Sequence, residues 1–153
     1  MKIVVQRVSS ASVEVEGEKI ASIGSGVVVF IGITHSDTVN QAIWLANKLI
    51  NLRIFENSLE KINQSLLEYN ADVLVISQFT LYADCTAGRR PSFTRAAQPE
   101  FARQLYEKFI EEVKKGGVKV LSGTFGADMK VSLLNNGPFT IILERLYEES
   151  FLK

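Results

Sequence analysis

Alternating apolar and polar positions dominate the first third of the chain and predict antiparallel strands. Within "ASVEVEG" (Ala11–Gly17), the valines Val13 and Val15 alternate with glutamates, so one strand face is buried and the other is wet. The stretch "KIVVQRV" precedes it, and Gly17-Glu18 turns the chain into "KIASIG". The run "GVVVFIGIT" is apolar on both faces and predicts a central strand.

Two later stretches have the spacing of amphipathic helices. The first is capped by Ser36 or Asp37 and has an apolar stripe formed by Val39, Ala42, Ile43, Ala46, Leu49 and Ile50. The second begins at Pro99 and ends at Gly116-Gly117, because proline suits the first helical position and glycine the end. Its stripe is Phe101, Leu105, Phe109, Ile110 and Val113.

The remaining segments add strands and place the chain in the α+β class. "RIFENSLEKINQS" predicts a strand end and a loop, and "DVLVISQFTLYAD" (Asp72–Asp84) predicts a buried strand with a polar interruption. "VKVLSGTF" and "VSLLNNGPFTIILE" supply the last strands. We expect one domain over residues 1–153, built as a mostly antiparallel or mixed, barrel-like β-sheet with two main helices packed outside.

The stretch "NNGP" (Asn135–Pro138) joins two apolar runs, which is the pattern of a β-hairpin. In the simplest such turn Pro138 would be the fourth residue and would have to donate an N–H that proline lacks. A turn with Gly137 and Pro138 at its centre is the other possibility, and one form of that turn has a cis Gly-Pro bond. The residues themselves leave this choice open.

Composition excludes several classes of protein. A hydrophobic content of 46% with 22% charged residues is typical of a globular chain rather than a disordered one. The single cysteine, Cys85, excludes an internal disulfide framework and favours a reducing compartment. The apolar start is too short for a signal peptide, and "GVVVFIGI" is far below the roughly 20 residues of a membrane span. We therefore expect a cytoplasmic protein without a membrane partner.

Charge identifies one candidate surface for nucleic acid. The net charge of zero argues against a general polyanion binder, which relies on many phosphate contacts. Arg89, Arg90 and Arg95 nevertheless cluster in "GRRPSFTR". They form either a local basic patch or an ordinary solvated loop.

Common catalytic motifs are absent from the sequence. There is no P-loop, no GxGxxG, no CxxC and no HExxH, and nothing has the spacing of a zinc site. Cys85 and His35 each follow a predicted strand and could form a nucleophile–base dyad. The alternative is that one is a small buried residue and the other a loop residue.

The segment "SQFT" (Ser77–Thr80) is the better candidate for chemistry. Ser77, Gln78 and Thr80 interrupt an apolar strand near its end, beside the arginine-rich loop. Their side chains could also just bond to neighbouring backbone. Thr80 is a poor nucleophile without a base, and none lies nearby in sequence. Backbone N–H groups at the strand end could instead stabilise an oxyanion.

The pairing of "SQFTL" (Ser77–Leu81) with "NNGPFT" (Asn135–Thr140) resembles the D-aminoacyl-tRNA deacylase family. "QRV" (Gln6–Val8), "ASVEVEG", "RIFEN", "RPSF" (Arg90–Phe93) and "ADMKVSLLNNGP" resemble further family segments in the same order. The resemblance runs to about Leu143, and residues 144–153 look like a variable tail.

The resemblance implies a homodimer that hydrolyses the ester joining a D-amino acid to the terminal adenosine of tRNA, and that also removes glycine mischarged on alanine tRNA. It implies no metal and no organic cofactor. Gly137 and Pro138 match a Gly-cis-Pro motif that enters the partner's active site and rejects L-amino acids. Arg7 matches the arginine that steadies this motif.

The catalytic residues implied by the resemblance are those of "SQFT". Phe79 and Thr80 match the strand end that lines the scissile ester, with Ser77 and Gln78 in support. We expect water to attack under an oxyanion hole, with help from the ribose 2′-hydroxyl. Two alternatives are a non-enzymatic RNA- or ligand-binding module that uses the arginine patch, and a small-ester hydrolase that uses Cys85 and His35.

Overall fold

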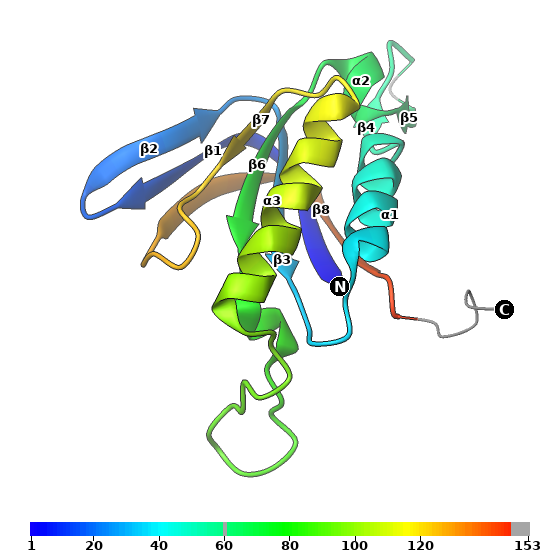
Figure 1. The fold of residues 1–153 in the computed structure, drawn as a ribbon. Helices are drawn as coiled ribbons and strands as arrows, with labels where there is room; N and C mark the ends of the chain where they lie inside the picture. Colours follow the sequence, from blue (N-terminus) through cyan, green and yellow to red (C-terminus); the bar gives the residue numbers. More distant parts are fainter. Residues whose placement is uncertain (60, 148–153) are drawn as a thin grey trace, which may run out of the picture.

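The computed structural model describes residues 1–59 and 61–147 (Figure 1). Most of the predicted tail, residues 148–153, lies outside this part. The strands are β1 (Lys2–Val15), β2 (Glu18–Ile23), β3 (Gly26–Gly32), β4 (Phe55–Glu56), β5 (Ile62–Gln64), β6 (Asp72–Ser77), β7 (Val120–Ser122) and β8 (Lys130–Glu144). The helices are α1 (Val39–Ile50), α2 (Leu66–Tyr69), α3 (Pro99–Lys115) and the 3-10 helix η1 (Phe79–Tyr82).

The main sheet is mixed, as the sequence predicts. Strand β1 pairs antiparallel with β3 through residues 2–8 and with β2 through residues 11–15. Strand β8 pairs antiparallel with β1 along nearly its whole length, and so lies on the opposite edge from β2 and β3. Strands β3, β6 and β7 are parallel to one another. The predicted central strand is therefore central, between β1 and β6.

Two cores lie on opposite faces of this curled sheet. On one face α1 and α3 cover Val5, Val29 and Val75 (Figure 1). On the other face Val28, Leu74 and Ile76 pack with residues from β1, β2 and β8. Strands β3 and β6 need apolar side chains on both faces because each face is covered, which explains their unbroken apolar runs.

The two main helices form where the sequence predicts them, but the details differ. Thr38, not Ser36 or Asp37, caps α1, and Gln41 completes a capping box with it. The buried face of α1 includes Leu45, whereas the predicted stripe residue Val39 is exposed. In α3, Pro99 is at the start and Gly116 caps the end, as predicted. Its buried face includes Ala102 and Tyr106, while Phe101 is exposed.

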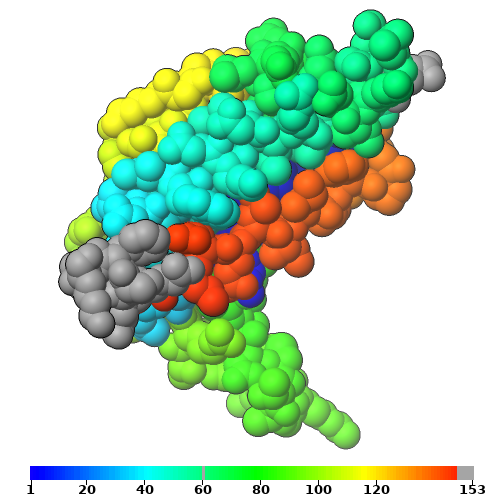
Figure 2. All heavy atoms as spheres, turned by 90° about the vertical axis from the view of Figure 1, so that its right-hand side faces the viewer, coloured from blue at the N-terminus to red at the C-terminus, as the bar shows by residue number. Residues whose placement is uncertain are grey.

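One strand prediction is wrong, and the choice that the sequence left open at "NNGP" is decided. The segment Asp72–Asp84 is not one strand, because β6 ends at Ser77 and η1 follows. The run through "NNGP" is not a hairpin: the chain does not reverse, and β8 continues to Glu144. The register moves from Val8↔Asn135 to Gln6↔Thr140, so Asn136–Phe139 bulge out opposite the single residue Arg7. Figure 2 shows β8 at the surface beside α1.

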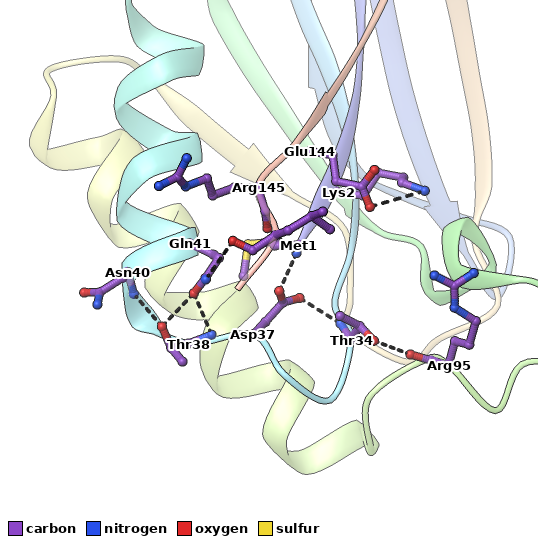
Figure 3. A network of polar contacts seen from close by, with 11 residues as sticks. Met1, Lys2, Thr34, Asp37, Thr38, Asn40, Gln41, Arg95, Glu144 and Arg145 are labelled. Carbon is purple, nitrogen blue, oxygen red and sulfur yellow. Dashed lines mark hydrogen bonds and ion pairs between the residues drawn. The ribbon is translucent and has the colours of Figure 1, made fainter. Parts of the chain in front are cut away.

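A polar network ties together the start of β1, the end of β8 and the turn before α1 (Figure 3). The amino group of Met1 donates to the Asp37 carboxylate and to the carbonyl of Arg145, the latter at 2.9 Å. The second carboxylate oxygen of Asp37 accepts from the N–H of Thr34 at 2.8 Å. Both side chains of the ion pair are almost fully buried, at 0% and 1% exposure. Asp37 therefore holds three segments in place instead of capping the helix.

Candidate active site

A cavity of about 630 Å³ opens at the end of β6. Ser77 ends the strand, and Gln78 still donates its N–H to the carbonyl of Ile31 at 2.8 Å before the chain turns into η1. The cavity brings together β6, the start of α3, the segment before β8 and the loop before α3. Its lining residues are Ile31, Ile33, Ile76, Ser77, Gln78, Phe79, Phe93, Ala96, Ala97, Gln98, Pro99, Ala102, Tyr106, Phe125, Gly126, Ala127, Asp128, Met129 and Val131.

Aromatic rings form part of the cavity wall. Phe79 and Phe93 meet edge to face with ring centroids 5.1 Å apart, and both side chains are exposed. Tyr106 is buried on α3 and donates its hydroxyl to the carbonyl of Val75 at 3.1 Å. Burial raises the pKa of Tyr106 to about 12, so this phenol stays neutral at ordinary pH.

The cavity offers few ionisable groups. Of its described lining residues, Asp128 is the one carboxylate, and it pairs with Lys130 at 2.9 Å on the surface. Thr80 does not line the cavity; its exposed hydroxyl accepts a hydrogen bond from the Gln78 amide. The arrangement can therefore present hydroxyl, amide and backbone donors to a ligand, but it lacks an obvious general base.

Backbone donors are available at the strand end. The first N–H groups of a 3-10 turn have no acceptor within that turn. In η1 the N–H of Leu81 donates to the carbonyl of Gln78 and closes the first turn. The N–H groups of Phe79, which lines the cavity, and of the neighbouring Thr80 precede it. This is a suitable position for donors to a developing oxyanion.

Gly137 and Pro138 form the tip of the β8 bulge, and their peptide bond is cis. Arg7, only 6% exposed, lies beneath the bulge. Its Nε donates to the carbonyl of Asn136 at 3.1 Å, and Nη1 donates to the carbonyl of Ile54 at 2.6 Å. Its guanidinium also lies 4.9 Å from the ring centre of Phe139.

Within one chain the two predicted halves of the site do not meet. Neither Gly137 nor Pro138 is among the residues that line the cavity beside Ser77–Phe79. Both are exposed at the surface, on the edge strand β8. The bulge is therefore available to a neighbouring molecule rather than to the cavity of its own chain.

The three arginines of the predicted patch separate into two groups. A two-stranded bridge between Asp84 and Ser92 forms the base of a projecting loop, seen at the bottom of Figure 1. Arg89 and Arg90 lie in the exposed loop beyond this bridge. Arg95 is closer to the body, and its carbonyl accepts from the Thr34 hydroxyl at 2.6 Å.

The Cys85–His35 dyad is not assembled. Cys85 is exposed, and the His35 Nε2 lies 2.8 Å from the carbonyl of Thr94 instead. Across residues 1–59 and 61–147, no group of three His, Cys, Asp or Glu side chains could hold a metal ion. No helix in the described part is both long and apolar enough to cross a membrane.

The structure adds residues that the sequence reasoning missed. Phe93 and Tyr106 come to the cavity from a loop and a helix that no sequence motif connects with β6. Asn135, Thr140 and Ile54 contact the bulge or its arginine. Asn135 and Thr140 stand inside the quoted "NNGPFT" segment, but no local pattern shows which side chain meets which backbone group.

Comparison with known proteins assigns the chain to a class of hydrolases that act on aminoacyl-tRNA. Residues 4–144 match the family model described as D-Tyr-tRNA(Tyr) deacylase. Proteins named D-aminoacyl-tRNA deacylase from Bacillus cytotoxicus and Bacillus thuringiensis are each 51% identical over 144 residues. That alignment covers 94% of this chain and 99% of each relative. The chain therefore belongs to the D-aminoacyl-tRNA deacylase family.

Solved structures agree with this assignment at the level of the fold. A structure titled c-Myc DNA Unwinding Element Binding Protein superimposes with a TM-score of 0.89 at 39% identity, covering 96% of this chain and all of that one. A probable eukaryotic D-amino acid tRNA deacylase gives a TM-score of 0.80 at 22% identity, covering 93% and 97%. The second comparison supports the fold alone.

Proposed function

We propose that this chain is an enzyme that hydrolyses the ester bond of D-aminoacyl-tRNAs, releasing the free amino acid and tRNA. The observation that carries the proposal is membership of the family, combined with a cavity beside Ser77, Gln78 and Phe79. An apolar cavity with a few polar groups is suited to a small ligand such as the end of an aminoacylated RNA. Cytoplasmic tRNA is the corresponding substrate pool, so we propose that the enzyme acts in the cytoplasm.

In the proposed mechanism water attacks the ester carbonyl, and the ribose oxygen leaves. The N–H groups of Phe79 and Thr80 donate to the oxyanion, while Ser77 and Gln78 support that end of the strand. Donors aimed at the developing charge need no ionisable side chain. The cavity's lack of an obvious base fits this mechanism, and the substrate's own 2′-hydroxyl assists the water.

Chiral selection is assigned to Gly137 and Pro138. Their backbone carbonyls leave room for an achiral or D-configured α-carbon and repel an L side chain. Specificity by repulsion of the wrong substrate allows one enzyme to accept many D-residues. Glycine esters, which carry no side chain, pass the same selection, so glycine mischarged on alanine tRNA is also a substrate.

We propose that two copies of the chain form a homodimer in which each bulge serves the other subunit's cavity. This arrangement accounts for the exposure of Gly137 and Pro138 and for their absence from the cavity of their own chain. In a two-fold dimer the same pair of surfaces meets twice, so both sites would be completed together.

The test of the proposed function compares D-tyrosyl-tRNA and L-tyrosyl-tRNA in parallel. Rapid loss of the D-ester with a stable L-ester supports the proposal. A third reaction with alanine tRNA that carries glycine tests the glycine activity. Binding of either RNA without loss of its ester would instead support a non-enzymatic binding module. Inhibition by thiol alkylation would restore the Cys85 alternative.

We predict that Thr80→Ala retains hydrolysis of D-tyrosyl-tRNA to within about tenfold of the wild type. The hydroxyl is exposed, lies outside the cavity and contacts the Gln78 amide rather than a base. Single-turnover kinetics measure the effect, with circular dichroism as the check on folding. A folded variant with no hydrolysis but normal tRNA binding would identify Thr80 as the nucleophile.

We predict that the double variant Arg89→Ala/Arg90→Ala weakens tRNA binding without slowing the chemical step. Both side chains lie on the projecting loop, where they can contact phosphates of the acceptor stem. The slope of log affinity against log salt should become shallower by about 1 to 2, roughly one unit per lost contact. KM should rise while kcat stays unchanged.

The matched control removes two positive charges elsewhere. Lys48 and Lys114 are exposed near the ends of α1 and α3, at the other end of the molecule from the loop (Figure 1). Lys48→Ala/Lys114→Ala should leave the salt slope at its wild-type value. Equal effects of the two double variants would show that net charge, not the loop, governs binding.

A further inference from the structure

The bulge Asn136–Phe139 is held on two sides, and Arg7 accounts for one of them. Its Nε bonds to the carbonyl of Asn136, at the first residue of the bulge. On the other side, the side chain of Asn135 spans the base of the bulge. Its Oδ1 accepts from the N–H of Phe139 at 3.0 Å, and its Nδ2 donates to the Thr140 hydroxyl at 3.0 Å.

The Asn135 side chain satisfies a donor that the sheet leaves without a partner. A bulge removes residues from the hydrogen-bonded ladder, so their backbone N–H groups need acceptors outside it. Phe139 is half-buried and lies within the bulge, between the paired residues Asn135 and Thr140. Its N–H points to an amide oxygen four residues earlier. Asn135 thereby closes the loop that carries Gly137 and Pro138.

Thr140 extends the contact into β1. Its hydroxyl accepts from the Asn135 amide and also from the Gln6 amide at 3.1 Å. The Thr140 backbone returns to the ladder opposite Gln6. The amide of Asn135 is therefore fixed at both ends, to the bulge through Phe139 and to the sheet through Thr140.

We propose that Asn135 is a positioning residue that sets how Gly137 and Pro138 are presented, and so determines the discrimination between D- and L-esters. The inference rests on the proposed role of these two residues in chiral selection. Asn135 acts through the bulge, and its own polar atoms are occupied by Phe139 and Thr140. A loosened bulge would still bind a D-ester, but its carbonyls would no longer repel an L side chain from a fixed position.

The experiment measures hydrolysis of D-tyrosyl-tRNA and L-tyrosyl-tRNA by Asn135→Ala, Asn135→Asp and Asn136→Ala. For Asn135→Ala we expect L-ester hydrolysis to rise about tenfold, the effect of losing roughly one or two hydrogen bonds, with the D-ester rate within about threefold. Asn135→Asp keeps an oxygen for the Phe139 N–H, and the Thr140 hydroxyl can rotate to donate to it. We expect it to restore wild-type discrimination.

Asn136→Ala is the matched control. It is the neighbouring asparagine and is exposed; its contact with Arg7 uses the backbone carbonyl, which alanine retains. We expect its D/L ratio to equal that of the wild type. A rise in the rate for the wrong substrate is a readout that simple loss of folded protein cannot produce.

Each outcome bears on the assignment. A folded Asn135→Ala variant that keeps the wild-type D/L ratio overturns it, as does an equal fall in both rates. If the alanine variant does not fold, Asn135→Asp is the variant that is measured. A ratio of D-ester to L-ester hydrolysis rates below that of Asn136→Ala then overturns the role of the Phe139 contact. A wild-type protein that fails to distinguish the two esters contradicts the proposed function itself, independently of Asn135.

Discussion

Gly137→Ala is expected to lower the rate of D-tyrosyl-tRNA hydrolysis about 100-fold, the effect of displacing a positioning group by roughly 1 Å. Gly137 has a φ of +136°, which L side chains rarely adopt. An added Cβ would lie 3.0 Å from the Phe139 nitrogen and 3.2 Å from both Arg7 Nη2 and Phe139 Cβ. The bulge must therefore move. Single-turnover hydrolysis measures the loss.

Gly17→Ala is the control for backbone strain away from the bulge. Gly17 also has a positive φ, +83°, but an added Cβ would have nothing within 4 Å. We expect some loss of stability and no change in the rate of hydrolysis. Wild-type activity and selectivity in a folded Gly137→Ala variant would remove Gly137 from the proposed site.

Mixing a cavity variant with a bulge variant tests whether the bulge serves the partner subunit. Phe79→Ala damages the cavity and Gly137→Ala damages the bulge, so a mixed dimer would hold one intact pair of surfaces. Random exchange makes about half of the dimers mixed, which restores roughly one quarter of wild-type activity in a two-fold dimer. No recovery after exchange would show that each bulge does not complete the other chain's cavity.

Asp37→Ala is expected to lower the free energy of unfolding by about 3–5 kcal/mol, because it leaves a buried charge without its partner. The Met1 amino group and the Asp37 side chain are almost fully buried, and Asp37 also accepts from the N–H of Thr34 (Figure 3). Burial lowers the pKa of the Met1 amino group from 8.0, and the hydrogen bond that this group donates to Asp37 opposes the effect. Chemical denaturation at one fixed protein concentration measures the change.

The pH dependence gives the same prediction a second readout. Since the unfolded chain binds the Met1 proton more tightly, the stability contribution of this group rises with pH between the lowered pKa and 8.0. Without Asp37 the pKa falls further, so the rise should begin at a lower pH and be larger in total. Lys130→Ala removes an exposed ion pair and should cost less than about 0.5 kcal/mol. An equally small effect of Asp37→Ala would contradict the network's importance.

The sequence predicted elements best where the signal is local. Pro99 begins α3 because its fixed φ suits the first helical turn, and Gly116-Gly117 ends it because Gly117 takes a φ of +87°, which L side chains rarely adopt. The stripes were less accurate: Val39 and Phe101 are exposed, while Tyr106 is buried because its hydroxyl reaches the carbonyl of Val75. Which side of a helix is covered depends on the sheet beneath it, and periodicity alone locates that side only approximately.

The lining of the cavity was anticipated in part. Ser77 and Gln78 were singled out because polar residues end an apolar strand, and Phe79 by resemblance to a family; all three line the cavity. Phe93 and Tyr106 were missed, since they reach the cavity from a loop and a helix that only tertiary packing brings to β6. Arg7 and the Gly137–Pro138 segment were connected by resemblance to a family, not by any local pattern.

By itself, the sequence determined that buried and exposed side chains alternate along β1, that β3 is apolar, and that two long helices form. It also excluded a hydrogen-bonded two-residue turn at "NNGP". The tertiary structure decided that this segment bulges instead of reversing the chain. Arg7 bonds to Asn136, 129 positions away, because β1 and β8 are neighbours in the sheet. Backbone preferences act over a few residues, whereas strand pairing chooses the partners of distant ones. The same pairing leaves Gly137 and Pro138 on an exposed edge.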